Sequence, residues 1–129
     1  NGDSRFNANL SQLNSDQFIV STLDGEMSTF IAKEDYPLAK TVSLPQSSSY
    51  AELFLNVINR KADITFASIS AANDFLKSNP YKIERVGNAP VRTFGETFAF
   101  VRGQDSMVSM WNIALGEIMN YGTVARMVA

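Results

Sequence analysis

The chain alternates short, largely apolar stretches with longer segments in which apolar residues recur every three to four positions. The short stretches predict strands, and the longer segments predict helices. The predicted strands are residues 18–22, 40–44, 62–67, 83–86, 91–94 and 97–101, and the predicted helices are 26–34, 46–61, 71–77, 107–119 and 123–128. Strands and helices that alternate in this way predict a three-layer α/β fold, in which helices flank a mainly parallel sheet.

The segment QSSSYAELFLNVINRK (46–61) carries a start signal for its helix. Glu52 follows Ser49 by three positions, which is the spacing of a capping box. The apolar face of the predicted helix comprises Leu53, Phe54, Val57 and Ile58. The first 16 residues, in contrast, scatter a few apolar residues among Asn, Ser and Asp, and they predict a loop with a short helical turn at 10–13.

Three predicted strands end in polar turns, at residues 24–28, 46–49 and 68–70. In parallel sheets, ligands bind beyond the carboxyl ends of the strands, where helix N-termini favour anions. Ser, Asp and Gly are also ordinary helix N-cap residues where no ligand binds. The turns therefore leave two alternatives open, a row of helix caps and the rim of a binding cleft.

The composition removes several kinds of chemistry. The 129 residues suit one domain, and 11 basic against 13 acidic side chains predict no surface for nucleic acid. No apolar run approaches the roughly 18 residues that span a bilayer. The absence of Cys and His excludes disulfides, thiolate nucleophiles, zinc–thiolate sites and a Ser-His-Asp arrangement. These exclusions favour a protein that is not an enzyme, with no catalytic residue, metal or cofactor.

Four segments, taken in order, resemble one known family. They are FIVSTLDGE (18–26), KEDYPLAKTVSLP (33–45), YAELFLNVINRKADITFAS (50–68) and ETFAFVRGQDSMVSMWNIALGEIMNYGT (96–123). Within them, YPLA (36–39), RKAD (60–63) and FAFVRG (98–103) correspond to the family elements FP-x-A, G-K-A-D and F-A-x-x-K-G. The chain thus resembles the type II periplasmic solute-binding proteins, especially those that serve amino-acid ABC importers.

The resemblance implies the organisation of that family, in which two α/β lobes close over a solute. Residues 18–92 resemble the second lobe, and residues 1–17 form a lead-in. Residues 93–129 resemble the returning strand and the C-terminal helices that normally pack on the first lobe, most of which has no counterpart here. Phe98, Phe100, Trp111 and Ile118 then lack their usual cover, which predicts either a homodimer through residues 94–129 or an excised fragment.

The function implied by the resemblance is capture of a small polar solute, an amino acid or a related compound, for an ABC permease. The expected location is the periplasm or the outside of the cell. Two alternatives on the same fold stay open. One is an extracellular solute-sensing domain of a receptor or a cell-wall enzyme. The other is a dehydratase-like enzyme, for which Glu26 is the candidate catalytic carboxylate.

The ligand-binding residues implied by the resemblance lie in the polar turns. They are Asp24, Gly25, Glu26, Met27, Ser28, Gln46, Ser47 and Ser68. Glu26 replaces the usual small hydroxyl residue, and Ser68 replaces an acidic residue that pairs with the ligand ammonium. Both departures disfavour an ordinary α-amino acid as the ligand. Asp63 is interpreted as a structural residue at a strand start, and Tyr50 as a cleft wall or a hydrophobic anchor.

Overall fold

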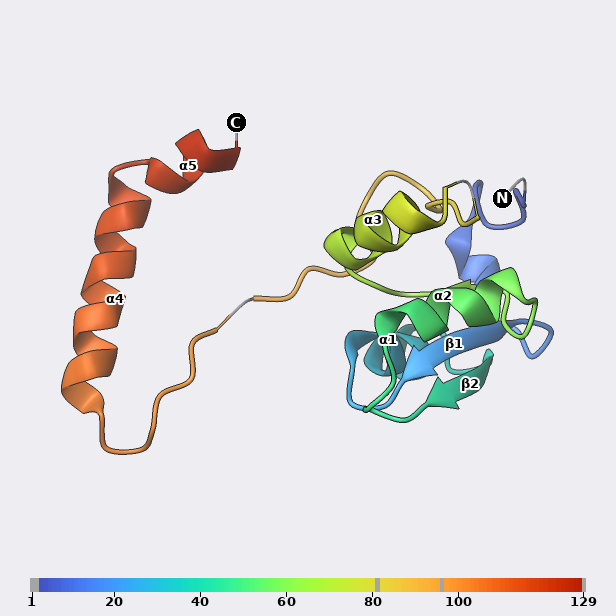
Figure 1. The fold of residues 1–129 in the computed structure, drawn as a ribbon, viewed down its shortest axis with the longest axis horizontal. Coiled ribbons are helices and arrows are strands. Elements are labelled where there is room, and N and C mark those ends of the chain that lie inside the picture. Colours follow the sequence, from blue (N-terminus) through green and yellow to red (C-terminus); the bar gives the residue numbers. More distant parts are fainter. Residues whose placement is uncertain (1–2, 81, 96, 129) are drawn as a thin grey trace. The chain divides into compact units, whose positions relative to one another are not determined.

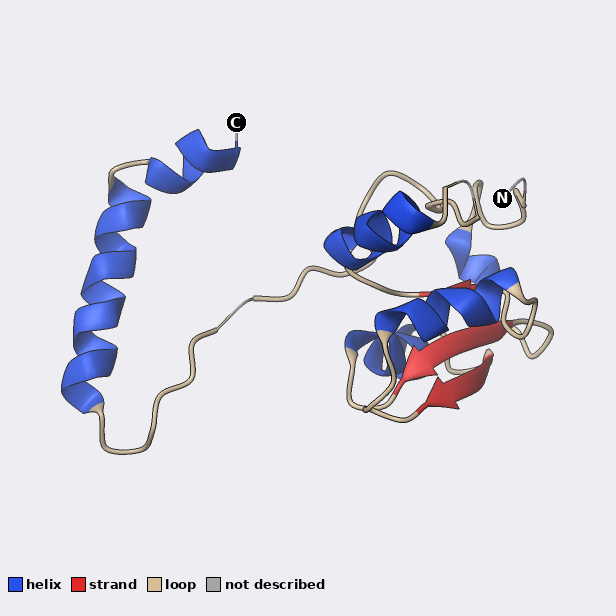
Figure 2. Ribbon diagram, in the orientation of Figure 1, coloured by secondary structure: helices blue, strands red, loops and turns tan. Residues whose placement is uncertain are grey.

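The computed structural model describes residues 3–80, 82–95 and 97–128, and the chain divides after Arg92 into two parts (Figure 1). The first part contains the 3₁₀ turn η1 (Leu10–Leu13), strands β1 (Ile19–Leu23), β2 (Lys40–Leu44) and β3 (Ile64–Thr65), and helices α1 (Met27–Asp35), α2 (Tyr50–Ile58) and α3 (Ile69–Ser78). The second part contains α4 (Asp105–Asn120) and α5 (Thr123–Val128) (Figure 2). No helix among the described residues is long and apolar enough to cross a membrane.

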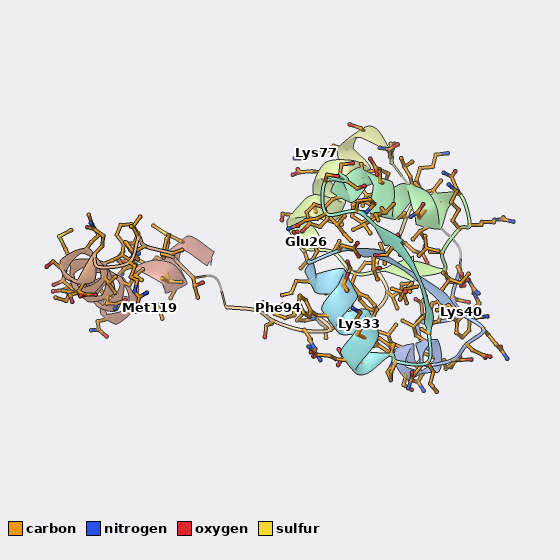
Figure 3. All side chains as sticks on the ribbon, turned by 90° about the horizontal axis from the view of Figure 1, so that it is seen from below. Glu26, Lys33, Lys40, Lys77, Phe94 and Met119 are labelled. Atoms are coloured by element: carbon orange, nitrogen blue, oxygen red, sulfur yellow. The ribbon has the colours of Figure 1, made fainter. Side chains whose placement is uncertain are left out.

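The three strands form one parallel sheet in the order β2-β1-β3. The pairing of β1 with β2 runs from Ile19↔Lys40 to Leu23↔Leu44, whereas β3 pairs only with Val20 and Ser21. Because parallel crossovers are right-handed, a connection to one side of β1 and a return to the other place their helices on opposite faces. Accordingly, α1 and α2 lie on opposite sides of the sheet (Figures 1 and 3). The predicted three-layer α/β fold is confirmed.

The hydrophobic core draws on the first residues of the chain as well as on the sheet and α1. Tyr36 and Phe66 stack with ring centroids 5.6 Å apart, and Phe6 meets Phe18 edge-on at 5.0 Å. The buried cluster comprises Phe6, Leu13, Val20, Ile31, Ala32, Tyr36, Ile64 and Phe66. The lead-in was predicted as a loop with a turn at 10–13, and η1 confirms that turn. The burial of Phe6 and Leu13 was not predicted, because two isolated apolar residues carry no periodicity.

Helix α2 covers the other face of the sheet with the apolar side predicted for it. Leu53 and Phe54 are buried, and Phe54 contacts Phe75 of α3 with ring centroids 4.9 Å apart. Ser49 is the N-cap residue, as predicted, but its side chain makes no capping hydrogen bond. The capping-box prediction is therefore wrong about the hydrogen bond of the Ser49 side chain, which does not form. The Glu52 amide instead donates to the Ser49 carbonyl at 3.0 Å, so the first turn closes through the backbone.

Three of the predicted strands are wrong. Residues 83–86, 91–94 and 97–101, all of which the structure describes, form no strand, and the strand predicted at 62–67 shortens to β3. A strand needs a neighbour for its backbone groups, and an apolar alternation supplies none. In the segment 97–101 the aromatic residues pack on a helix instead. The rings of Phe98 and Phe100 lie 4.9 and 6.3 Å from that of Trp111.

Helix α4 carries a wide apolar side that the second part does not cover. None of its residues is buried, and Trp111 keeps 38% of its surface exposed despite its contacts with Phe98 and Phe100. A groove of about 680 Å³ runs between the segment 97–105 and the helix. A stretch of this size cannot build a core of its own. The homodimer through residues 94–129 stays a prediction, and the exposed side chains are consistent with a surface that needs cover.

The burial of α2 predicts a large difference between two leucines on that helix. Leu53 is fully buried and Leu55 is 41% exposed, although both belong to α2. We expect Leu53→Ala to lower the free energy of unfolding by about 2–5 kcal/mol, because it removes packed atoms and leaves a cavity. Leu55→Ala, the matched control, should change it by less than about 1 kcal/mol. Urea unfolding followed by far-UV circular dichroism measures both, and equal losses would contradict this packing.

Candidate functional site

The three polar turns predicted from the sequence lie at one edge of the sheet. They follow the carboxyl ends of β1, β2 and β3, which are parallel and adjacent. The order β2-β1-β3 makes the carboxyl end between β1 and β3 a topological switch point, the position at which open α/β sheets bind ligands. The fold thus brings the candidate residues to an edge suited to a binding site.

The turn after β1 touches the turn after β2. Gly25 has φ +78°, a conformation that favours glycine, and it allows the chain to reverse into α1. A Cβ at this position would lie 3.5 Å from Nε2 of Gln46, so the Gln46 side chain lies beside Gly25 on the side where a side chain would be. The Asp24 amide donates to the Leu44 carbonyl at 2.9 Å, which holds the same two turns together through the backbone.

Glu26 and Tyr50 make a second link across this edge. Glu26 precedes α1 as its N-cap residue, where a negative charge suits the helix dipole, and Figure 3 shows it at the start of that helix. The Tyr50 hydroxyl donates to Oε2 of Glu26 at 2.8 Å. This hydrogen bond, together with partial burial and the carboxylate charge, raises the pKa of Tyr50 above its ordinary value. The bond orients the Glu26 carboxylate, which makes no ion pair with any described residue.

Ser28 and its neighbour Thr29 serve the turn itself. Ser28 is 1% exposed, and its Oγ accepts a hydrogen bond from the Leu23 amide at 2.9 Å. Thr29 Oγ1 donates to the Leu23 carbonyl at 2.7 Å. Since β3 ends before it reaches Leu23, the Ser28 hydroxyl satisfies the Leu23 amide, and the Leu23 carbonyl accepts from both Thr29 Oγ1 and the Glu26 amide, the latter at 3.0 Å. Ser28 therefore positions the turn from inside the protein, and its hydroxyl does not face the solvent edge.

The remaining candidates lie at the exposed side of the edge. Met27, half-buried, is the first residue of α1, and Ser47 is exposed in the turn after β2. Ser68 is the N-cap residue of α3, where its Oγ accepts from the Ala71 amide at 3.2 Å and lies 3.0 Å from Oγ of Ser70. Ser68 thus acts as a helix cap, one of the two alternatives that its position allowed.

Asp63 lies at the opposite edge and has the structural role predicted for it. Its Oδ2 accepts from the Ile19 amide at 2.9 Å, while the Asp63 amide donates to the Ile19 carbonyl at 2.8 Å. Its Oδ1 pairs with Nη2 of Arg5 at 2.9 Å. Hydrogen bonds from Arg5 to Asp3 and then to Asp63 hold the pKa of the guanidinium above its ordinary value. These contacts fix the start of β1 against β3.

The chemistry of the edge is that of hydrogen bonds and carboxylates. Among the described residues, no group of three or more acidic side chains could hold a metal ion. The bond between Glu26 and Tyr50 was not predicted, because the two residues are 24 positions apart and neither residue's surroundings in the sequence indicate the other. Comparison with family models, curated proteins and solved structures finds no match to the chain.

The buried hydroxyl of Ser28 predicts a loss of stability on truncation. We expect Ser28→Ala to lower the free energy of unfolding by about 1–3 kcal/mol, because the Leu23 amide loses its buried acceptor. Ser47→Ala removes an exposed hydroxyl from a neighbouring turn and should change stability by less than about 0.5 kcal/mol. Urea unfolding of the two variants makes the comparison, and an equally small effect for both would show that this hydrogen bond contributes little.

The contact between Tyr50 and Glu26 predicts an elevated tyrosine pKa. A ¹³C NMR titration of the tyrosine rings should place Tyr50 above the ordinary value of 10.0, and Glu26→Gln should reduce the elevation. The pKa of Tyr50 is higher in the folded state than in the unfolded state. The contribution of its protonated hydroxyl to the free energy of unfolding is therefore fully present below pH 10.0, and it is lost as the pH rises through the folded-state pKa. Glu52→Gln, which removes a carboxylate from α2 itself, should leave the Tyr50 pKa unchanged.

Proposed function

We propose that this chain forms part of the substrate-binding component of an ABC importer and captures a small polar solute at the carboxyl edge of its sheet. The observation that carries the proposal is the joining of the turns at this edge. Gly25 lies against Gln46, and Glu26 is hydrogen-bonded to Tyr50. Both links join the turn after β1 to residues that follow β2, at the carboxyl edge of the sheet and beside the switch point between β1 and β3.

The charges of the edge define the class of solute. Asp24 and Glu26 contribute two carboxylates, and residues 24–28, 45–50 and 66–70 contain no Lys or Arg. A ligand that presents only a carboxylate would meet repulsion at this edge, whereas an amine, an amide or a hydroxyl can donate to Glu26. The proposed solute is therefore a small polar molecule that presents donor groups to the turn after β1.

The resemblance to two-lobed solute-binding proteins supplies the proposed mechanism. In such a protein the edge of one lobe faces a second lobe, and hinge closure traps the solute between them. Closure requires that each rim be rigid. The turn after β1 meets this need, because Ser28 and Thr29 fix Leu23 while Tyr50 fixes Glu26. The closed form is then the one that the permease receives, in the periplasm or outside the cell.

A thermal-shift screen tests the proposal on the chain and on the full-length product of its gene. Small amines, amides, polyols and amino acids are added singly, because a ligand that binds only the folded state raises its melting temperature. We expect at least one donor-rich solute to raise the melting temperature, with an effect equivalent to about 2.7 kcal/mol at a hundred times its dissociation constant.

Binding by two variants and uptake of the solute by cells then test the two parts of the proposal, the binding site and the importer. Glu26→Gln should weaken the shift, while Glu117→Gln, an equal change of charge on α4, should not. Uptake of the same solute by cells that carry or lack the gene tests the importer. A screen in which the full-length protein binds none of these solutes would overturn the proposal, as would equal binding by the two variants.

A further inference from the structure

A second pocket, lined by polar and charged residues, lies beside the proposed solute edge, between α1 and the strands β1 and β2. Its volume is about 190 Å³. It is lined by Thr22, Asp24, Thr29, Lys33, Thr41 and Ser43. Only Asp24 belongs to the turns discussed above, and no apolar side chain contributes to the lining. A concave site with convergent polar groups is the usual form of a small-molecule site.

The strand register and the helix spacing build this pocket. Thr22 pairs with Ser43 across the sheet, and Thr41 precedes Ser43 by two positions, so the three side chains share one face. Thr29 and Lys33 are four residues apart on α1, which places them one turn apart on the same side of the helix. Figure 3 shows Lys33 on α1, whereas Lys40 lies on β2.

Thr22 is an almost fully buried residue whose hydroxyl opens into the pocket. It is 2% exposed, next to fully buried Val20, at a position where an apolar side chain would be expected. Its Oγ1 makes no hydrogen bond among the described residues, although the buried hydroxyls of Ser21 and Ser28 both have partners. No buried side-chain oxygen or nitrogen of the described residues lacks a partner, so the Thr22 hydroxyl is open to solvent through the pocket, where it is available to a ligand.

The pocket also offers two opposite charges that do not pair with each other. The Asp24 carboxylate accepts a hydrogen bond from the Ser43 hydroxyl and makes no ion pair within the described part of the chain. Lys33 likewise makes no ion pair there. Both side chains are exposed, so solutes reach them from solvent. The Asp24 carboxylate would repel a ligand that carries only a negative charge, and the Lys33 ammonium would repel a ligand that carries only a positive charge.

We infer that this pocket binds a small zwitterion. The anionic group of the ligand lies at the Lys33 ammonium, its cationic group lies at the Asp24 carboxylate, and the threonine hydroxyls hydrogen-bond between them. Binding at this place does not require the solute capture proposed above. Apart from Asp24, which belongs to the turn after β1, its residues lie on α1, β1 and β2, whereas Glu26, Gln46 and Ser68 belong to the turns at the carboxyl edge.

Nitrogen-15 NMR of the full chain tests the inference with three probes of similar size, namely β-alanine, acetate and methylammonium. We expect β-alanine to shift the amide signals of Thr22, Thr29, Lys33 and Thr41 in a saturable way. Acetate can pair with Lys33 but is repelled by Asp24, and methylammonium can pair with Asp24 but is repelled by Lys33. Each should therefore bind with an affinity at least about tenfold lower than that of β-alanine, which is the loss expected for one charge-assisted hydrogen bond.

Variants decide whether the pocket is responsible. Lys33→Met should lower the affinity for β-alanine by at least about tenfold. Lys40→Met, which removes the same charge from an exposed position on β2 outside the pocket, should leave binding unchanged. If Lys33→Met alters the fold, Thr41→Val serves in its place, because it removes only an exposed hydroxyl. Binding that either substitution leaves intact would overturn the inference.

The map of shifted signals separates this inference from the proposed function. Saturable shifts confined to Gly25, Glu26 and Gln46 would support the solute edge and overturn the pocket. Shifts confined to Thr29, Lys33 and Thr41 would support the pocket, whatever the thermal screen shows. Equal affinity for β-alanine and acetate would overturn the zwitterion, since the Asp24 carboxylate would then have no effect on the ligand.

Discussion

The pairing of β1 with a neighbour on each side is the constraint on which the first part of the protein depends. Alternate residues of β1 point their backbone groups toward β2 and β3, and residues 20–23 are almost entirely buried. At its start, Ile19 is tied to Asp63. At its end β3 has stopped, so the Leu23 amide and carbonyl bond to Ser28 and Thr29 instead. The sharp entry into α1, and with it the position of every polar turn, follows from this pairing.

The polar residues around this strand form two groups, which differ in whether their side-chain hydroxyls or carboxylates are hydrogen-bonded to backbone amides. Ser28, Ser68 and Asp63 are satisfied by backbone amides and fix the geometry of turns and strands. Glu26 is oriented by a single tyrosine, and the Thr22 hydroxyl opens into the pocket between α1, β1 and β2. A group that is satisfied inside the fold adds rigidity, and a group that is oriented but incompletely paired is available to a ligand. The ligand contacts proposed above therefore belong to the second group.

The second part shows the limit of local pattern as a source of tertiary structure. The apolar period of residues 107–119 suffices to form α4, because helix hydrogen bonds close within the segment itself. The alternation in residues 97–101 forms no strand, because strand hydrogen bonds need another segment. Phe98 and Phe100 pack on Trp111 instead, and much of the helix surface remains apolar and exposed. Exposed apolar surfaces of this kind are typical of interfaces, and the homodimer through residues 94–129 stays a prediction.

The sequence by itself determined the order of the elements from β1 to α3, the strand at Lys40–Leu44, the turn at Leu10–Leu13 and the gathering of three polar turns at one edge. Each of these follows from periodicity or from the direction of parallel strands, which are local properties. The tertiary structure alone decided that Phe6 and Leu13 enter the core, that Ser28 faces inward and that Tyr50 reaches Glu26. It also assembled a pocket from three separate elements. Contacts between residues distant in the chain depend on how helices and strands pack, which no local pattern specifies.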